Sequence, residues 1–423
     1  MDTTTSEQAL RREAIRRRLQ GERRTNICRE LQRSRRWFSK WWAEYRRNPG
    51  TDFADRSRAP STSPQRLPPH VVQAVVTVRH VFAAAATPQT RYGLIGHRAI
   101  QNELARLQIR PLPSLATIQR LLAAAGLTQP RGVASAAAYY PWPVAWEVNA
   151  IHATDIIARH VYGGEEIDNF HTLDHYSHAV HLTQHADKTT RTACQHLLRT
   201  WACLGLPHVE QFDNDGAFCG GHTHPHVLGQ VVRLCLWCGV EVFFTPFYDP
   251  QRNYQIETFH SLWEAAFWSR YQFHNLAHVR AEVPRFLRWY HTRYRPPALN
   301  GKTPAQMRRG QAVRPLTAAL RHLLPPGRLP LTTGRIHLMR KVSTAGTIEL
   351  LNELWPVGPR WIGHYVRATI DTAKQTLTVW HQPEAQAEWH LLKTRRFWLK
   401  ETVHDLLPAF RHNSARCREQ WPG

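Results

Sequence analysis

Three acidic residues in the middle of the chain lie in the sequence contexts that metal-dependent phosphoryl transfer requires. Asp155 ends an alternation of apolar and polar residues over 146–155, which predicts a strand whose last residue points out of the end of a sheet. Asp213 follows a second short predicted strand and precedes a turn-prone Asn-Asp-Gly sequence. Glu257 lies in a segment whose apolar residues recur at helical spacing. Two strand ends and one helix can therefore bring the three carboxylates together.

The chemistry expected of these three acids depends on a cation. Carboxylates that converge without one repel each other, and at least one would take up a proton. Mg²⁺ is typically held by one or two protein carboxylates with waters and phosphate oxygens, and a pair of ions activates the attacking oxygen and stabilises the leaving oxygen at phosphorus. Any one acid beside a turn is better explained as a cap or a solvated group. Taken together with their flanks, Asp155, Asp213 and Glu257 predict a site for two Mg²⁺ or Mn²⁺ ions.

The residues around the acids form a wider pattern of short motifs. They are Thr154-Asp155, Leu173-Asp174, Gly205-Leu206-Pro207, Phe212-Asp213-Asn214 and the stretch from Pro250 to Glu257. In these motifs the segment 144–310 resembles the catalytic core of the insertion-sequence transposase and retroviral integrase superfamily. The resemblance implies an α/β ribonuclease H-like core in which Asp155, Asp213 and Glu257 are the catalytic residues and the ligands of two Mg²⁺ or Mn²⁺ ions.

The resemblance also implies a function. A protein of this kind is a DNA transposase, an integrase-type polynucleotidyl transferase. It cleaves DNA strands at the ends of its element and joins the freed 3′-hydroxyl to target DNA. The expected partners are double-stranded DNA, as element ends and as target, and further copies of the same chain, because two ends must be joined in one event and each core holds one active site.

Departures from the family pattern leave alternatives open. The chain has Tyr254 where the family often has glycine, and Asp215 offers a second choice for the middle acid. Asp213 is preferred because it directly follows the strand. The interval from Asp213 to Glu257 is also longer than is usual in the family, with a His-rich insertion at 220–226. A catalytically inactive, transposase-derived DNA-binding protein is therefore the alternative function.

The order of predicted elements in the core agrees with the resemblance. Alternation and apolar runs predict strands near 147–158, 165–173, 178–185, 207–213 and 240–244. Helical spacing predicts helices near 189–203, 225–238, 254–271 and 276–294. The resulting order, βββαβαβα, is that of the ribonuclease H-like fold, although a fold alone does not establish a chemistry.

A DNA-binding helical unit is expected over 7–46. Three short helices are predicted there, and Ser34 can cap the third. This helix carries the candidate DNA-binding residues Arg35, Arg36 and Lys40. The pattern is typical of a helix-turn-helix, in which the first residues of the last helix contact base edges in the major groove. A small helical bundle with a solvated basic face would give the same pattern and is the alternative.

Further modules are expected on either side of the core. A second helix-turn-helix-like unit is predicted over 71–127, although plain amphipathic helices would give the same spacing. Over 331–400, short alternating segments separated by turns predict strands, and this region resembles the small SH3-like β-barrel that follows the core in many relatives. The expected fold class is multidomain, with all-α helix-turn-helix units, an α/β ribonuclease H-like core and a C-terminal barrel.

The composition favours a nucleic-acid partner. The 423 residues carry a net charge of +23, and such an excess favours binding to a polyanion through counterion release. The sequence contains no apolar run of about 18 residues and no signal-peptide core at its N-terminus. We therefore expect no membrane association and a cytoplasmic protein that is associated with the nucleoid when it binds DNA.

The seven cysteines do not indicate a disulfide framework. An odd number scattered through a long chain fits reduced thiols. The Cys and His residues over 219–238 have spacings that a zinc site could use. The same cysteines also fit the buried face of a helix, where Cys acts as a small apolar residue. Both interpretations are open from the sequence.

The first prediction concerns DNA recognition by the first helical unit. If Arg35 or Arg36 is bidentate to a guanine, replacing it by Ala costs about 1–3 kcal/mol and relaxes the preference at one base pair. Replacing Arg23, as a phosphate contact, weakens binding to all sequences alike and flattens the salt dependence by about one unit of slope. Titrations of element-end and scrambled DNA at several salt concentrations separate the two effects. A fragment lacking residues 1–46 that still selects the ends as sharply would make 71–127 the recognition unit.

Overall fold

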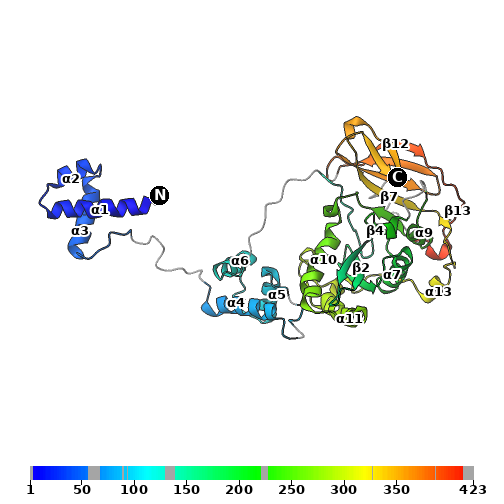
Figure 1. The fold of residues 1–423 in the computed structure, drawn as a ribbon, viewed down its shortest axis with the longest axis horizontal. Helices are drawn as coiled ribbons and strands as arrows, with labels where there is room; N and C mark the ends of the chain where they lie inside the picture. The colour runs from blue at the N-terminus through cyan, green and yellow to red at the C-terminus, as the bar shows by residue number, and fades with distance from the viewer. Residues whose placement is uncertain are drawn as a thin grey trace. The chain divides into compact units, whose positions relative to one another are not determined.

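The described part of the chain comprises two units. The computed structural model describes residues 3–55, 67–87, 90–92, 94–128, 139–220, 227–325, 327–385 and 387–412. The units are Met1–Pro68 and Pro69–Gly423, and each is described by itself. Figure 1 follows the chain from the N-terminal helices in blue to the C-terminal strands in orange and red. Within the described ranges, no helix has the length and apolar character needed to cross a membrane.

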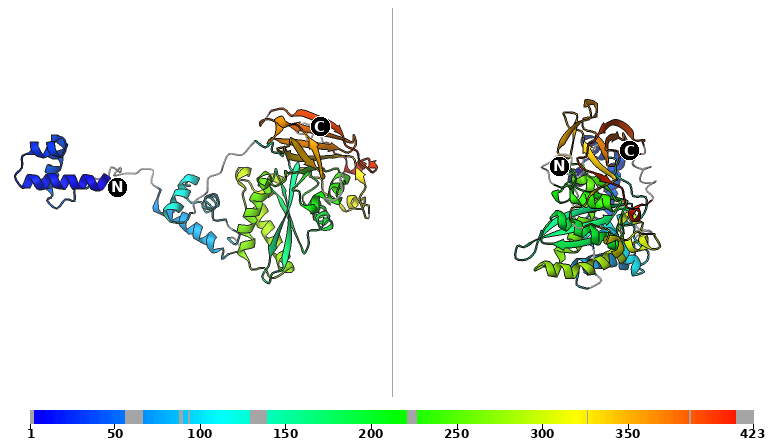
Figure 2. Two further views of the ribbon diagram at one scale, coloured as in Figure 1. Left: turned by 45° about the horizontal axis from the view of Figure 1, so that its top comes forward. Right: turned by 90° about the vertical axis from the view of Figure 1, so that its right-hand side faces the viewer.

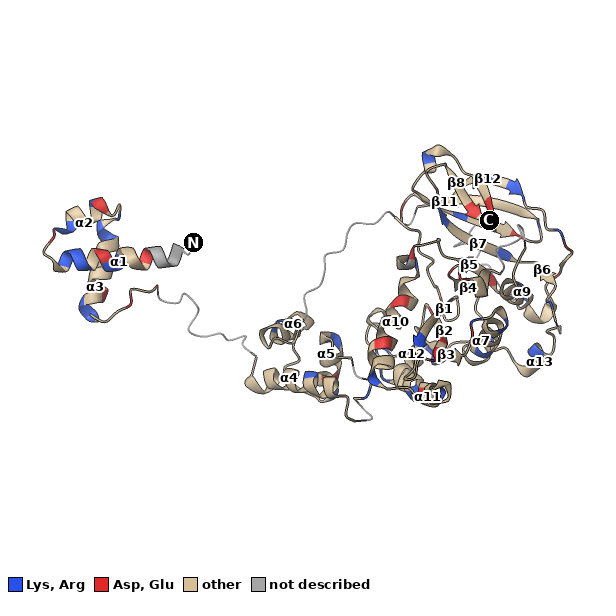
Figure 3. Cartoon of the chain, viewed as in Figure 1, with Lys and Arg blue, Asp and Glu red and all other residues tan. Residues whose placement is uncertain are grey.

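Three helices make up the first unit, as the sequence predicts. They are α1 (Thr3–Leu19), α2 (Arg24–Glu30) and α3 (Arg35–Arg47). The Ser34 hydroxyl accepts a hydrogen bond from the Trp37 N–H at 3.1 Å, which confirms the predicted cap of α3. Ala14, Ile27 and Phe38, one from each helix, pack together in a small apolar core. The helices also carry many Lys and Arg residues, coloured blue in Figure 3.

Three more helices begin the second unit. They are α4 (Pro69–Ala84), α5 (His97–Arg106) and α6 (Leu115–Ala124). Ser114 caps α6, because its hydroxyl accepts the Thr117 N–H at 3.2 Å. Val75, Ile100 and Ile118 are buried where the three helices meet. The packing explains why these segments are helical, and it does not by itself make either triplet a helix-turn-helix.

A mixed α/β core follows. Its strands are β1 (Ile151–His160), β2 (Glu166–Asp174), β3 (Val180–His185), β4 (Val209–Phe212) and β5 (Glu241–Phe244). Its helices are α7 (Thr190–Cys203), α8 (Gly216–Cys219), α9 (Gln230–Trp237), α10 (Tyr254–Ala266) and α11 (Leu276–Thr292). β1, β2 and β3 pair antiparallel, whereas β4 is parallel to both β1 and β5. Apart from the short α8, the predicted order βββαβαβα is confirmed, and the arrangement is consistent with a ribonuclease H-like core.

The predicted bounds of the first strand are wrong. β1 starts at Ile151 rather than near 147 and continues to His160, so that Asp155 lies inside the strand and not at its end. The reason is that β1 has two partners of different length. β2 pairs with almost all of β1, whereas β4 pairs with it only as far as Thr154. Asp155 therefore lies where the parallel partner ends and the antiparallel partner continues.

The two faces of the core sheet are covered by different helices. α7 and α9 cover one face, in an apolar cluster that includes Leu197, Phe212 and Val231. α10 and α11 cover the other face, where Trp263 and Phe286 are buried. In the left view of Figure 2, the yellow-green helices α10 and α11 lie on one side of the strands and the darker green helices on the other. Because successive residues of a strand point to opposite faces, neighbours along β1 face different helices.

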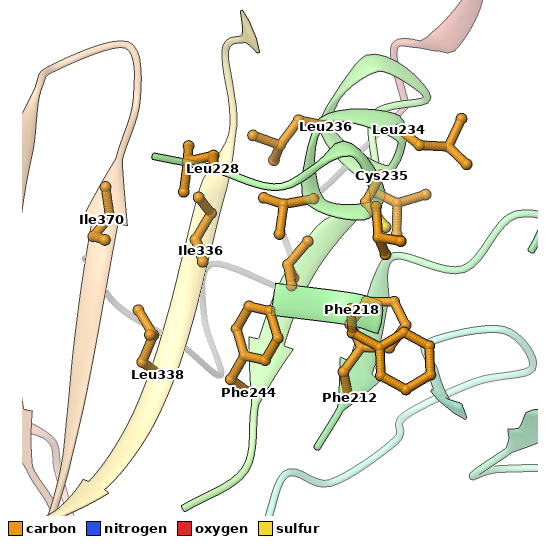
Figure 4. Packing of buried hydrophobic residues seen from close by; sticks show 14 of the residues in the cluster. Phe212, Phe218, Leu228, Leu234, Cys235, Leu236, Phe244, Ile336, Leu338 and Ile370 are labelled. Carbon is orange, nitrogen blue, oxygen red and sulfur yellow. The ribbon is translucent and has the colours of Figure 1, made fainter. Parts of the chain in front are cut away.

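The C-terminal strands continue the core sheet. They are β7 (Arg335–Lys341), β10 (Tyr365–Asp371), β11 (Thr376–His381) and β12 (His390–Arg396). β7 pairs in parallel with β5, and the sheet order is β12-β11-β10-β7-β5-β4-β1-β2-β3. The structure thus does not show the separate SH3-like barrel expected over 331–400. The physical reason is that β7 pairs with the edge that β5 would otherwise leave open, and that Ile336 and Leu338 join the apolar cluster of Phe212 and Phe244 (Figure 4).

Smaller elements complete the fold. Two short sheets are formed by β6 (Leu331–Thr332) with β13 (Val403–His404) and by β8 (Thr347–Leu350) with β9 (Glu353–Pro356). The short helices are α12 (Pro304–Arg308) and α13 (Ala318–Arg321). The 3₁₀ helices are η1 (Pro250–Asn253), η2 (Trp268–Arg270), η3 (Pro297–Leu299), η4 (Pro359–Trp361) and η5 (Pro408–Phe410). Of these, η1 leads directly into α10.

A buried polar network joins β1, β2 and β4 to α7. The Thr154 hydroxyl donates to Glu210 Oε1 at 2.6 Å, and the Trp201 indole N–H donates to Glu210 Oε2 at 3.0 Å. Thr154 also bonds Thr172, which in turn bonds His196 of α7. Burial raises the pKa of Glu210 to about 7, because its carboxylate would lose hydration. The network holds β1 against β4. Its hydrogen bonds lower the pKa of Glu210, but burial outweighs them and favours the protonated form of this acid.

The second prediction concerns the pH dependence of stability. The pKa of Glu210 is about 7 in the folded chain against an ordinary value of 4.5, so the folded chain keeps a proton that the unfolded chain loses between these pH values. Stability therefore falls as pH rises from 4.5 to 7, by on the order of 3 kcal/mol at most from this group. In Glu210→Gln this contribution is absent. Urea unfolding at several pH values measures the free energy of unfolding of both proteins. The value for the variant should rise relative to that of the wild type up to neutral pH, and the difference should be constant above it. A difference that does not change with pH would contradict this.

Candidate active site

Strand pairing brings two of the predicted site residues together. Thr154 lies opposite Phe212 in the parallel pair of β1 and β4, so the next residues along each chain segment are Asp155 and Asp213. Asp155 is half-buried on the face that α10 covers, and its Oδ1 accepts the N–H of Ile156 at 2.7 Å. The sheet therefore holds two carboxyl groups at the point where β4 ends.

Helix α10 adds the third acid and a histidine. Glu257 is in the first turn, and His260 follows one turn later on the same side. His260 Nδ1 lies 4.0 Å from Asp155 Oδ2 and 3.8 Å from Glu257 Oε2, which are distances of electrostatic attraction rather than of hydrogen bonds. One ligand atom from each of the three residues lies within 4.8 Å of the others. In the part of the chain that the structure describes, they form the one group of this kind that could hold a metal ion.

Burial and mutual repulsion govern the charge of the acids. Burial, and after it the charge of Asp213, raises the pKa of Asp155 well above its usual value. Burial also raises the pKa of Asp213, with smaller contributions from the charges of Asp215 and Glu257. His260 has the opposite effect and holds the pKa of Glu257 below its usual value. The acids therefore resist being ionised together, and a divalent cation between them would relieve the repulsion.

Asp213 and Asp215 have different surroundings. Asp215 Oδ1 accepts the Ala217 N–H at 2.9 Å as the cap of α8, and Asp215 Oδ2 lies 3.0 Å from Lys188 Nζ. Asp213 directly follows β4 and accepts the Asp215 N–H with Oδ1 at 3.1 Å. Although Asp213 lies outside the 4.8 Å group around His260, its charge acts on that group. Both carboxylate oxygens of Asp215 have partners, so Asp213 is the better placed of the two to be the second acid of the site.

The sequence did not single out His260. The available signal was its position three residues after Glu257, which puts both side chains on one side of a helix. Its ring is buried and packs edge to face against His171 of β2, with ring centroids 5.0 Å apart. Burial keeps the pKa of His171 well below its usual value, so this neighbour is uncharged at neutral pH. The ring of His260 is held among these buried neighbours, and its Nδ1 is directed at the carboxylates of Asp155 and Glu257.

Two sets of contacts fix the start of α10. Gln211 of β4 donates its amide N–H to Asn253 Oδ1 at 2.7 Å. Arg252 Nε lies 3.0 Å from Asp249 Oδ2, and the Tyr365 hydroxyl of β10 donates to the same carboxylate. The turn η1 is therefore tied to β4 on one side and to β10 on the other. The C-terminal strands thus take part in positioning the third acid.

A buried arginine of β7 supports the loop after β4. Arg340 donates from Nη2 to Asn214 Oδ1 at 2.9 Å and from Nη1 to the Thr245 carbonyl at 2.9 Å. Its Nε donates to the Glu349 carbonyl at 3.0 Å. Asn214 directly follows Asp213, so this one side chain fixes the position of the second acid from the C-terminal part of the sheet.

The remaining predicted residues do not take part in this group. Arg35, Arg36 and Lys40 are exposed on α3 of the first unit. Of the possible zinc ligands, Cys235 and Cys238 are buried in the apolar cluster beneath α9, where burial raises the pKa of both thiols. The histidines of the same segment, at positions 222, 224 and 226, lie outside the described residues. The two buried cysteines fit the apolar alternative.

Comparison with known proteins gives distant structural neighbours. No protein-family model matches the sequence, and no curated protein matches it. The HTLV-2 integrase catalytic core domain in complex with magnesium, in its trimeric form, is 15% identical, with 39% of this chain and 99% of that chain covered and a TM-score of 0.31. A chain of the simian T-cell lymphotropic virus intasome in complex with PP2A regulatory subunit B56 gamma is 13% identical over 74% of this chain and 100% of that chain, with a TM-score of 0.36.

A third neighbour is the catalytic core domain of BIV integrase, which is 16% identical, with 37% of this chain and 92% of that chain covered and a TM-score of 0.29. The neighbours named here thus come from retroviral integrases and an intasome. At identities below 25% and TM-scores below 0.5, these likenesses do not establish the family or the function of this chain.

Proposed function

We propose that this protein is a DNA transposase that cleaves strands at the ends of its element and joins the freed 3′-hydroxyl to target DNA. The observation that carries this function is the convergence of Asp155, Asp213 and Glu257 from two paired strands and one helix. Carboxyl groups that repel one another in a partly buried place are unfavourable without a cation, and they are ligands that Mg²⁺ and Mn²⁺ prefer. The chemistry that fits them is phosphoryl transfer.

The three acids would hold two Mg²⁺ or Mn²⁺ ions. When bound, such a pair supplies activation of the attacking oxygen and stabilisation of the leaving oxygen at phosphorus. Hard oxygen donors fit these ions, and a cation would offset the burial and the repulsion from Asp213 that raise the pKa of Asp155. His260 Nδ1 faces both Asp155 and Glu257, at 4.0 Å from Asp155 Oδ2 and 3.8 Å from Glu257 Oε2. The proton of the attacking group passes to solvent, since no residue is assigned as a base.

The partners follow from this chemistry. Double-stranded DNA is the substrate, as element ends and as target, and the net charge of +23 supports a polyanionic partner. The helical units over 7–46 and 71–127 would bind the ends, with Arg35, Arg36 and Lys40 exposed for contact with bases or phosphates. Two ends need two catalytic cores over 144–310, so we propose a homo-oligomer, at least a dimer, on the DNA. A DNA substrate also supports a cytoplasmic, nucleoid-associated protein.

The third prediction concerns metal binding without catalysis. An ion that binds only the folded chain stabilises it, by about 2.7 kcal/mol at a concentration 100 times its Kd. For a folded unit as large as Pro69–Gly423, each kcal/mol raises the melting temperature by about 1–2 °C. Mn²⁺ should therefore raise the melting temperature of the wild type. Asp155→Asn should melt above the wild type in EDTA, because it removes the repulsion at the site, and should gain little from Mn²⁺.

The matched control for metal binding is Glu165→Gln, an exposed acid in the turn between β1 and β2. It should keep the full response to Mn²⁺, since it lies on an exposed turn away from the three acids. Scanning calorimetry of the wild type and both variants, with EDTA and with Mn²⁺, measures the shifts. A wild type that no divalent ion stabilises would have no metal site at these acids.

The fourth prediction concerns strand transfer. Purified protein with Mg²⁺ or Mn²⁺ and matching end DNA should form joined product. Asp155→Ala, Asp213→Ala and Glu257→Gln should each lower the rate by about 10³-fold or more, because each removes stabilisation of charge in the transition state, while DNA binding remains. Asp215→Asn keeps the cap of α8 and should retain most of the activity. Gel analysis of labelled ends measures nicking and joining separately.

The same assay decides between related functions. Sequence-specific binding without nicking under any divalent ion would favour the alternative, a catalytically inactive transposase-derived DNA-binding protein. Nicking without joined product would indicate a hydrolytic nuclease. Activity that survives Asp213→Ala but is lost in Asp215→Asn would move the second ligand to Asp215.

A further inference from the structure

A cavity of about 710 Å³ lies beside the start of α10. Its walls include Trp142, Tyr176 and Tyr254, together with His175 and Gln211. The aromatic side chains are unusually exposed for their size, with 49% of Tyr254 and 39% of Trp142 accessible to solvent. The rings of Trp142 and Tyr254 meet nearly at right angles, with centroids 4.6 Å apart. The cavity thus has an aromatic rim that is partly exposed to solvent.

The walls of this cavity carry almost no net charge. Arg252 is the one Lys or Arg among the described residues that line it, and no Asp or Glu lines it. The guanidinium of Arg252 is paired with Asp249 at 3.0 Å, and its face stacks over Tyr140 with 5.0 Å between the guanidinium carbon and the ring centroid. Burial lowers the pKa of His175 to about 3, so this imidazole is neutral at neutral pH. The cavity therefore suits an uncharged group rather than a phosphate.

The walls of the cavity also contain buried polar atoms without hydrogen-bond partners among the described residues. Both ring nitrogens of His175 and the Oε1 atoms of Gln211 and Gln255 are buried and have no hydrogen-bond partner among the described residues. Buried polar groups are normally paired, and each unpaired one costs about 1–3 kcal/mol. Aromatic faces combined with neutral donors and acceptors are the surroundings that a heteroaromatic ring with polar edges requires.

The cavity adjoins the three acids through two elements. Gln211 lies two residues before Asp213 and on the same side of β4, and its amide bonds Asn253 at 2.7 Å. Tyr254 lies one helical turn before Glu257 in α10. One turn is about 5 Å along the axis, which is close to the rise of one or two nucleotides along a DNA strand. A strand with a phosphate at the acids therefore has a neighbouring base within reach of the cavity.

We infer that this cavity receives one unstacked nucleobase of the substrate strand, held against Tyr254 and Trp142 next to the phosphodiester at the acids. The assignment rests on the proposed function for the identity of the strand as DNA. It gives a role to the exposed ring of Tyr254, the first residue of α10. Holding a base out of its stack would expose the adjoining phosphate and fix its distance from the acids.

The test compares the binding of two probes by the full-length chain in buffer without divalent metal. One is a short oligothymidylate and the other an abasic oligomer of the same length and charge, and fluorescence anisotropy measures both affinities. The wild type should prefer the oligothymidylate. Tyr254→Ala should reduce this preference by between about 5- and 150-fold, as expected for the loss of one base–aromatic stack, and should leave the affinity for the abasic oligomer unchanged. Tyr254→Phe should retain the preference, because a phenyl ring still stacks.

Two further variants test whether the effect is specific to the cavity. One changes its second aromatic wall, and the other changes a tyrosine elsewhere on the surface. Trp142→Leu keeps bulk at the second wall and should also lower the preference, and thermal unfolding shows whether each variant is folded. Tyr162→Ala changes an exposed tyrosine between β1 and β2 that does not line the cavity, and it should behave as the wild type.

Several outcomes would overturn the assignment. They are an equal loss of affinity for both probes in Tyr254→Ala, an unchanged preference in both Tyr254→Ala and Trp142→Leu, or a change of oligomeric state in sedimentation without a change of preference, which would give the cavity to a second copy of the chain. Because the readout needs neither metal nor cleavage, it can succeed where strand transfer fails, and it can fail in an active transposase.

Discussion

Repulsion among carboxyl groups is the constraint on which the arrangement of this molecule depends. Burial and neighbouring charges raise the cost of ionising Asp155 and Asp213, so these acids stay beside Glu257 only if their backbones are held by contacts elsewhere. The parallel pairing of β1 with β4 holds the first two, and the bond between Gln211 and Asn253 holds the helix that carries the third. The stability of the sheet is thus used to keep like charges close.

The polar groups on the opposite face serve the same constraint. Thr154 points away from the acids and donates to Glu210, so that β1 and β4 are joined by side chains as well as by backbone bonds. On the side of the acids, the imidazole of His260 faces both Asp155 and Glu257. The polar side chains on one face of the sheet therefore join β1 to β4, and the carboxylates that this pairing holds together lie on the other face.

Local patterns predicted much of this arrangement, because strands, helices and caps are encoded over short distances. The order of elements in the core and the caps at Ser34 and Ser114 depend on neighbouring residues alone. The place of Asp155 within β1 was missed because it depends on the unequal lengths of two partner strands. His260 was missed because its importance comes from a residue on another element. The region expected as a barrel is part of the core sheet. The pairing of β5 with β7 could not be predicted, because the sequence of neither strand indicates which strand it pairs with.

The guanidinium of Arg340 links the order of synthesis to the completion of the site. It bonds Asn214 beside the second acid, yet it belongs to β7, which follows all three acids in the chain. On the ribosome, all three acids emerge before this side chain does. Until β7 docks, the amide N–H of Asn214 can bond the Thr245 carbonyl, but its Oδ1 lacks the guanidinium of Arg340. A nascent or truncated chain that stops before β7 therefore carries every acid and lacks the support that holds the second one. A strand that is made after all three acids thus completes the support of the second one.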